Sequence, residues 1–231
     1  MSGNQQLQKK LNQGLSEINL LLTISQQNAL LAYLALLDKW NQVYNLTAIR
    51  QLEQMLIYHL LDTLAVIPFI DDWNSSHTKA LRILDVGSGG GLPGIPWALA
   101  RPDWQLSLID CVQKKTTFLT QVKMQLNIMN LRVITGHVEK LPNYISDTQF
   151  DIIVCRAFSS LEQFLTLAGS WLAPGGLSIA LKGEYPSQEL TALSDAWHVE
   201  AIHPITPISG LDAQRHVVLV SRKHTEKTKQ G

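Results

Sequence analysis

The sequence predicts an α/β protein in which a mainly parallel sheet carries helices on both faces. Three observations lead to this prediction. Strand-like and helix-like segments alternate from Leu81 onward. A glycine cluster, residues 87–94, directly follows the first of these strands. The chain has 231 residues, of which 45% are hydrophobic, enough for one large domain with a helical extension.

Short apolar segments of strand length recur between residues 81 and 221, and each is followed by a turn or by a helical pattern. The last two are joined by a loop that contains Gly210, without a helix, which favours an antiparallel final strand at one edge of the sheet. The predicted strands are Leu81–Val86, Gln105–Ile109, Arg132–Thr135, Phe150–Val154, Leu177–Leu181, His198–Ile205 and His216–Ser221.

Helical patterns fill the gaps between these strands. Apolar residues at helical spacing predict helices over Lys114–Leu126 and Leu161–Leu172, and a further helix near Gln188–Trp197. The segment Ala173–Gly176 reads Ala-Pro-Gly-Gly, which predicts a helix stop followed by a turn.

Residues 1–78 are predicted to form an N-terminal helical region. An apolar stripe from Leu30 to Tyr44 follows a cap at Thr23 or Ser25, and a second stripe from Leu52 is stopped by Pro68. The polar segment 71–79 is the expected linker. The chain is thus divided into the helical region 1–78, a domain at 79–222 and a short basic tail at 223–231.

Composition narrows the classes of function. Lys and Arg together number 19, as do Asp and Glu, so a general polyanion binder is disfavoured and any basic site is local. The two cysteines, Cys111 and Cys155, form neither a metal-ligand spacing nor a disulfide framework, and no metal is expected. The polar N-terminus and the short apolar run Ala29–Leu37 predict a cytoplasmic protein with no membrane partner, because a bilayer span needs roughly 20 residues.

The glycine cluster points to a nucleotide-type cofactor. Residues 89–94 contain the Gly-x-Gly-x-x-Gly spacing that holds the pyrophosphate of a nicotinamide dinucleotide. Two features disfavour a pyrophosphate here. Asp85 lies in the strand end before the first glycine, and Pro93 and Pro96 remove N–H donors from the turn that would bind phosphate.

Three further positions lie at the predicted carboxyl edge of the sheet, where open α/β sheets bind ligands. Asp110 ends the second strand and either accepts ribose hydroxyls or caps the next helix. Val138 and Glu139 follow the third strand and either read an adenine edge or lie in an ordinary surface loop. Arg156 ends the fourth strand, where a packing role is unusual. A ribose and an adenine occur in several cofactors, so these residues do not choose between them.

The segment Asp-x-Gly-x-Gly-x-Gly resembles the first motif of class I S-adenosylmethionine-dependent methyltransferases. Further motifs resemble one bacterial family over residues 25–222, the small-subunit (16S) rRNA guanine-N7 methyltransferases, also called the glucose-inhibited division protein B family. These motifs are Trp40-Asn-x-x-Tyr44-Asn45-Leu46-Thr47, His59-x-Leu-Asp62, Asp85-Val-Gly-Ser-Gly-Gly-Gly-Leu-Pro-Gly-Ile-Pro96, Arg156-Ala-Phe158, Leu181-Lys182-Gly183 and Arg215-His216.

The resemblance implies a Rossmann-like seven-stranded sheet behind a helical region, and methylation of guanine N7 in the 530 loop of 16S rRNA. The partner is then 16S rRNA or the small ribosomal subunit, and we expect a monomer. The candidate phosphate or RNA contacts are Lys182, Arg215 and His216, each of which could equally be an ordinary surface residue. The implied S-adenosylmethionine contacts are Gly87, Leu92, Val138, Glu139 and Arg156, to which the motifs add Gly89 and Asp110.

Guanine N7 carries a free lone pair, so methyl transfer to it needs no general base, and no catalytic residue is assigned. Two positions depart from the family. Cys155 stands where serine is common, and Thr117 stands where another basic residue is common. A cysteine nucleophile would suit methylation of another base, at a pyrimidine, although a buried thiol is the commoner role. Two rival hypotheses are a nicotinamide-dependent oxidoreductase that uses the same glycine loop, and a cofactor-binding ribosome module without activity.

Overall fold

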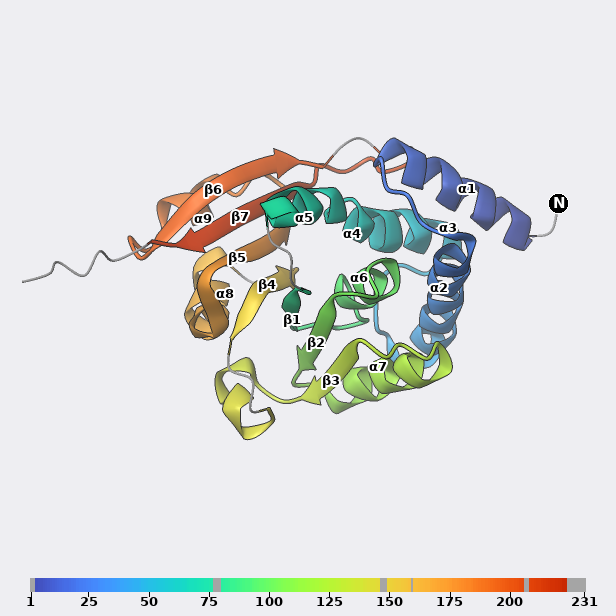
Figure 1. The fold of residues 1–231 in the computed structure, drawn as a ribbon. Helices are drawn as coiled ribbons and strands as arrows, with labels where there is room; N and C mark the ends of the chain where they lie inside the picture. The colour runs from blue at the N-terminus through green and yellow to red at the C-terminus, as the bar shows by residue number, and fades with distance from the viewer. Residues whose placement is uncertain (1–2, 77–79, 146–148, 159, 206–207, 224–231) are drawn as a thin grey trace, which may run out of the picture.

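The computed structural model describes residues 3–76, 80–145, 149–158, 160–205 and 208–223. A seven-stranded sheet with the strand order β3-β2-β1-β4-β5-β7-β6 forms its centre (Figure 1). All neighbouring pairs are parallel except those of β7, which is antiparallel to both β5 and β6. The predicted fold class is confirmed. The strands are β1 (Arg82–Val86), β2 (Gln105–Asp110), β3 (Leu131–Thr135), β4 (Phe150–Arg156), β5 (Leu172–Lys182), β6 (Trp197–Pro204) and β7 (His216–Arg222).

Helices cover both faces of the sheet, and Figure 1 shows α2, α6 and α7 on one side and α8 on the other. The longer helices are α1 (Gly3–Glu17), α2 (Ile24–Tyr44), α7 (Gln113–Gln125) and α8 (Leu161–Ala168). The shorter ones are α3 (Leu52–Met55), the π-helix η1 (Leu56–Leu61), α4 (Asp62–Leu64), α5 (Ile67–Trp73), η2 (Asn74–Ser76), α6 (Gly94–Ala100), η3 (Val138–Asn143), η4 (Gly169–Trp171) and α9 (Ser187–Thr191).

The sheet separates two apolar cores. Successive strand residues point to opposite faces, so Ile83 packs into one core and its neighbour Leu84 into the other. The N-terminal helices share the first core with the sheet, since Leu34 of α2 and Leu60 of η1 are buried in the same cluster as Ile83. The helical region is thereby fixed against the sheet. The division of the chain at residue 78 stays a prediction, and that residue lies outside the described ranges.

Local signals decided some helix ends as predicted. Thr23 caps α2: its hydroxyl accepts from the backbone N–H of Gln26, whose side chain returns a contact to the Thr23 backbone. Asn45, with φ of 51°, ends this helix in the left-handed conformation that asparagine tolerates. The predicted break after the first apolar stripe is therefore real.

Three predicted boundaries differ from those of the structure. The helix that carries the second apolar stripe ends at Leu64, shortly before Pro68, and Pro68 lies in the first turn of the next helix, α5, where its missing N–H has no helical partner to lose. Residues 71–73 of the expected linker belong to α5, while 77–79 and the tail 224–231 lie outside the described residues. The helix predicted near 188–197 is the five-residue α9, and Trp197 begins β6.

The predicted turn at Ala173–Gly176 lies inside β5. That strand begins at Leu172 and pairs with β4 through a register shift between Phe150 and Ile152. Gly175, with φ of 75°, accommodates the irregular stretch. The pairs with β4 jump from Leu172 to Leu177, so residues 173–176 bulge out of the ladder, and the Pro-Gly-Gly sequence interrupts the pairing instead of preceding the strand.

The segment Leu52–Trp73 is long and apolar enough to pass a length-and-composition test for a membrane span, with 22 residues and a mean hydropathy of 1.2. Within the protein, 67% of its most apolar 18-residue stretch is buried. It packs against the sheet and α6, which is the position of a core helix.

Candidate functional site

A cavity of about 310 Å³ lies at the carboxyl edge of the sheet, where β1, β2 and β4 end. This is the edge at which open α/β sheets bind nucleotide cofactors. The sequence-predicted residues that line it are Gly87, Asp110, Val138, Glu139 and Arg156. The fold therefore brings together five positions spread over 70 residues of sequence.

The glycine loop approaches this cavity with its backbone. Gly87, Gly89 and Gly91 have φ of 70°, 56° and 91°, a region that other residues rarely adopt. A Cβ placed on Gly87 would meet only the Phe158 ring, at 3.9 Å, so the space beside this residue is open. A ligand can therefore lie directly against the backbone at Gly87.

Asp85 holds the glycine loop through hydrogen bonds. One carboxylate oxygen accepts from the N–H of Gly94 at 3.0 Å, and Ser88 Oγ donates to the Asp85 carbonyl at 2.9 Å. The other carboxylate oxygen, Oδ1, has no hydrogen-bond partner within the described part of the chain. Burial raises the pKa of Asp85 to about 7. Asp85 is fully buried and does not line the cavity, so its role is to hold the loop.

Asp110 also binds the glycine loop, through its carboxylate. Its Oδ2 accepts from the N–H of Gly89 at 2.9 Å, and its Oδ1 accepts from the N–H of Val112 at 2.9 Å. The N-cap of α7 is Val112, so Asp110 does not cap that helix. Lys115 Nζ also lies 3.5 Å from Oδ2. Since an ionised carboxylate offers about four lone-pair positions, Asp110, which lines the cavity, retains one further acceptor position, on Oδ1.

Arg156 lies between the cavity and the helical region. Its Nη2 donates to the Tyr58 carbonyl at 2.8 Å and lies 3.2 Å from His59 Nδ1. Its Nη1 is buried and finds no partner among the described residues. Ala157, which follows, has φ of 56°, an uncommon conformation for a residue with a Cβ and one that clusters at functional sites.

His59 supports this arginine from the π-helix η1. Its Nε2 lies 2.6 Å from Thr47 Oγ1, so both ring nitrogens have a neighbour within hydrogen-bond distance. Burial, together with the nearby Arg156 charge, lowers the pKa of His59 to about 4, and the ring is neutral at physiological pH. The simple interpretation of His59 as a packed core histidine therefore misses its contact with the site.

A second cavity, of about 650 Å³, lies at the ends of β4 and β5 and shares Ala157 and Phe158 with the first. Lys182 lines it and is paired with Glu189, at 2.7 Å. His216 lies beside it, with its Nδ1 3.2 Å from the Gly183 carbonyl and its ring against Tyr185. The first cavity alone therefore does not account for the predicted substrate residues.

Arg215, the remaining predicted RNA contact, lies 3.3 Å from Asp62 Oδ1. Both predicted cations, Lys182 and Arg215, thus have an acidic partner within the protein. Sequence reasoning missed Glu189, Tyr185 and the role of Asp62. Glu189 and Tyr185 lie close to Lys182 in the sequence, but in a segment too short to show a helical period, whereas Asp62 lies far from Arg215 in the sequence.

Two predicted cofactor residues do not line the first cavity. Leu92 is half-buried and packs against the core beside α6. Gly89 does not line the cavity, and its N–H donates to the Asp110 carboxylate. Cys155 is 1% exposed in the second core, and burial raises the pKa of its thiol. A buried neutral thiol is not a nucleophile, so the cysteine route to a pyrimidine is disfavoured. Thr117 is exposed on α7, with its hydroxyl bonded to the Gln113 carbonyl.

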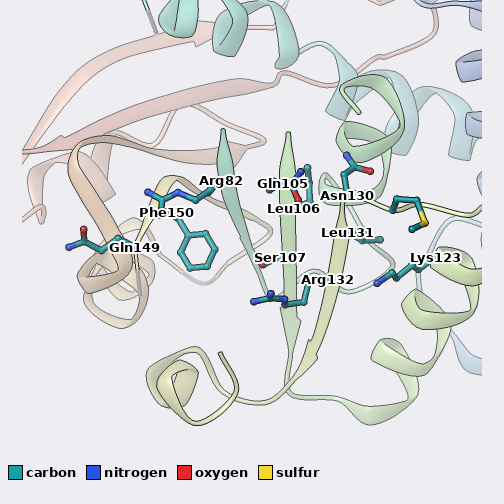
Figure 2. Close-up of a pocket in the computed structure, with 11 residues that line it drawn as sticks. Arg82, Gln105, Leu106, Ser107, Lys123, Asn130, Leu131, Arg132, Gln149 and Phe150 are labelled. Carbon is teal, nitrogen blue, oxygen red and sulfur yellow. The ribbon is translucent and has the colours of Figure 1, made fainter. Parts of the chain in front are cut away.

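A third cavity, of about 360 Å³, lies at the opposite edge of the sheet, where the strands begin (Figure 2). Lys123 and Arg132 line it together with Arg82, whose guanidinium is paired with Asp151 at 3.3 Å. It contains none of the sequence-predicted site residues. The carboxyl-edge cavities remain the candidate site.

The family model of GidB, described as rRNA small subunit methyltransferase G, matches residues 26–218. A protein of Burkholderia ambifaria named ribosomal RNA small subunit methyltransferase G is 47% identical, over 93% of this chain and 92% of its own length. One of the same name from Chromobacterium violaceum is 48% identical, over 90% of this chain and 95% of its own length.

Solved structures share the fold at low identity. TrmN from Thermus thermophilus superposes with a TM-score of 0.52 at 17% identity, over 69% of this chain and 48% of its own. MtNAS, in complex with MTA and tNA, superposes with a TM-score of 0.57 at 12% identity, over 83% of this chain and 71% of its own. These likenesses support the fold class.

Proposed function

Since the chain belongs to the family of rRNA small subunit methyltransferase G, which makes it an rRNA methyltransferase, we propose that it transfers a methyl group from S-adenosylmethionine to N7 of a guanine in the 530 loop of 16S rRNA. The observation that carries the cofactor part is the carboxyl-edge cavity lined by Gly87, Asp110 and Arg156. The base and its position in the RNA rest on the motifs shared with the family.

The residues present suit S-adenosylmethionine. The open backbone at Gly87, which lines the cavity, suits close contact with the amino-acid part. Asp110 retains an acceptor position for a ribose hydroxyl, and Val138 with Glu139 offers an N–H beside a carboxylate for adenine. When bound, this cofactor supplies an electrophilic methyl group on a sulfonium.

The chain's own residues then have to orient the acceptor and exclude water. N7 of guanine attacks with its own lone pair, so no side chain has to remove a proton from the nucleophile. Orientation alone contributes about 7–11 kcal/mol to lowering such a barrier. Arg156 is held from behind by Tyr58 and His59, which suits a positioning role toward the cofactor.

The RNA contact is expected to be local. The chain has a formal net charge of zero, and Lys182 and Arg215 both have acidic partners. We therefore expect that assembled RNA or ribosomal protein supplies part of the binding surface, in the cytoplasm, and that binding weakens as salt rises.

The test is transfer of labelled methyl from S-adenosylmethionine to small ribosomal subunits that lack the modification, followed by mapping of the methylated base. Label at one guanine N7 of the 530 loop is the expected result, and label elsewhere contradicts the assignment of the base. Binding of S-adenosylhomocysteine compared with NADH separates this function from an oxidoreductase. Cofactor binding without transfer would indicate a ribosome module that has no activity.

A further inference from the structure

The second carboxyl-edge cavity has the size and place of an acceptor site. Its volume of about 650 Å³ falls within the range of about 300–1,000 Å³ usual for small-ligand sites. It meets the cofactor cavity at Ala157 and Phe158, which line both. A base that enters this cavity therefore lies next to the place where the methyl group would be delivered.

Two charged side chains form one wall of this cavity. Lys182 Nζ donates to Glu189 Oε1 at 2.9 Å and to Oε2 at 2.7 Å. The backbone N–H of Leu161, at the start of α8, also donates to Glu189 Oε2. The Lys182 side chain is only 11% exposed, so this is not an ordinary mobile surface pair.

The pair leaves one donor beside one acceptor. An ammonium has three N–H donors, and Lys182 directs two of them to Glu189. A carboxylate has about four lone-pair positions, and Glu189 uses three, for the two lysine contacts and for Leu161. What remains is a lysine N–H next to a free position on Glu189 Oε1.

This order of groups complements guanine. On the guanine ring the O6 acceptor is next to the N1–H donor, whereas adenine presents an amino donor next to the N1 acceptor. Cytosine is inverted in the same way as adenine. Uracil matches guanine at O4 and N3–H but has no N7 to accept a methyl group.

We propose that Lys182 and Glu189 read the acceptor guanine, with Lys182 donating to O6 and Glu189 accepting from N1–H. This inference rests on the proposed function. O6 lies between N1 and N7 on the purine, so a base held in this way leaves N7 unobstructed. Bases taken out of a stack commonly rest on aromatic side chains, and Tyr185 and Phe158 line the same cavity.

A purely structural role is the competing explanation, because the pair also attaches α9 to the start of α8. Base discrimination separates the two. We would measure kcat/KM on small subunits in which the target guanosine is replaced by inosine, which keeps O6 and N1–H, or by 2-aminopurine, which lacks both but keeps N7.

With the wild-type protein, inosine is expected to react within about threefold of guanosine, and 2-aminopurine at least a hundredfold more slowly. Glu189→Gln and Lys182→Met are each expected to lower kcat/KM on guanosine at least tenfold and to narrow the preference for guanosine over 2-aminopurine at least tenfold. Glu162→Gln is the matched control: it changes an exposed glutamate on α8 outside the cavity and should alter neither value.

The outcomes distinguish the two proposals. No label at guanine N7 with the wild-type protein overturns the proposed function. Normal guanine methylation with an unchanged preference in both folded variants, as judged by circular dichroism, assigns the pair a structural role and overturns the base-reading inference. If either variant fails to fold, the wild-type series still decides: rejection of inosine as strong as that of 2-aminopurine also overturns it.

Discussion

Arg156 Nη2, at the end of β4, lies 3.6 Å from Oδ2 of Asp62 in the helical region. The same carboxylate lies 3.3 Å from Arg215 Nε, through its other oxygen. The Asp62 side chain is only 3% exposed. One buried carboxylate thus joins the cofactor cavity, the helical region and the start of β7, and the N-terminal helices take part in building the site.

Asp62→Asn is expected to destabilise the protein strongly. The change leaves two guanidinium groups close together without their counter-charge, and breaking a buried ion pair from one side costs on the order of 3–5 kcal/mol. Urea denaturation measures the change in the free energy of unfolding. The matched control is Asp71→Asn, whose partner Arg101 forms a more exposed pair and whose expected cost is below about 1 kcal/mol. Equal losses of unfolding free energy in the two variants would show that Asp62 does not stabilise the charges of Arg156 and Arg215.

Arg156→Ala is expected to weaken cofactor binding or turnover at least tenfold, about 1.4 kcal/mol. Arg156→Lys should recover only part of this loss, because an ammonium keeps the charge but cannot contact Tyr58 and the cavity with separate nitrogens. Isothermal titration with S-adenosylhomocysteine and the methyl-transfer rate are the two measurements. Arg132→Ala, in the cavity at the opposite edge, is the control and should leave both unchanged. Wild-type values for Arg156→Ala would remove this residue from the site.

Gly87→Ala and Gly175→Ala form a matched pair. The two glycines have φ of 70° and 75°, and a Cβ added to either would meet no atom closer than 3.9 Å. Both substitutions should therefore cost about 1–2 kcal/mol of stability, for backbone conformation alone. Only Gly87 lines the cofactor cavity, so only Gly87→Ala should weaken binding of S-adenosylhomocysteine in titration. If both variants bind it equally well, the cofactor does not lie against this backbone.

Sequence patterns predicted the sheet well because its central strands β1, β2 and β4 are almost wholly buried and therefore read as short continuous apolar segments. The same logic located Asp110, Glu139 and Arg156, since residues that end parallel strands meet at one edge. Boundaries failed at Pro68, which begins a new helix, and in the Pro-Gly-Gly stretch, which bulges out of β5 between two segments paired with β4.

The supporting contacts of the site had no local signal. Arg156 meets Tyr58 across 98 positions of sequence, and His59 is placed by a π-helix whose apolar stripe looks like that of an ordinary helix. Glu189 lies on a helix of five residues, too short to show a helical period. Such partners become visible only when the chain is folded.

His59 and Asp85 are expected to give the stability of the cofactor-free protein opposite pH dependences. The folded-state pKa of His59 is lowered from 6.5 to about 4, so between these values the unfolded chain binds more protons and stability rises with pH. The folded-state pKa of Asp85 is raised from 3.8 to about 7, so over that range the folded chain binds more protons and stability falls as pH rises. In the shared window the two effects oppose each other, and the wild-type dependence should be shallow.

Single substitutions separate the two contributions. In His59→Gln the Asp85 effect remains, so the free energy of unfolding should fall between about pH 4.5 and pH 6.5; in Asp85→Asn the His59 effect remains, so the slope over the same interval should be more positive. Each group contributes at most about 1.4 kcal/mol per pH unit. Burial also raises the pKa of the nearby Asp62, which adds the same falling contribution to both variants, so the two slopes are compared with each other. Urea denaturation at the two pH values gives the slopes. A slope in Asp85→Asn that is no more positive than the slope in His59→Gln would mean that these two groups do not have the shifted pKa values in the folded protein.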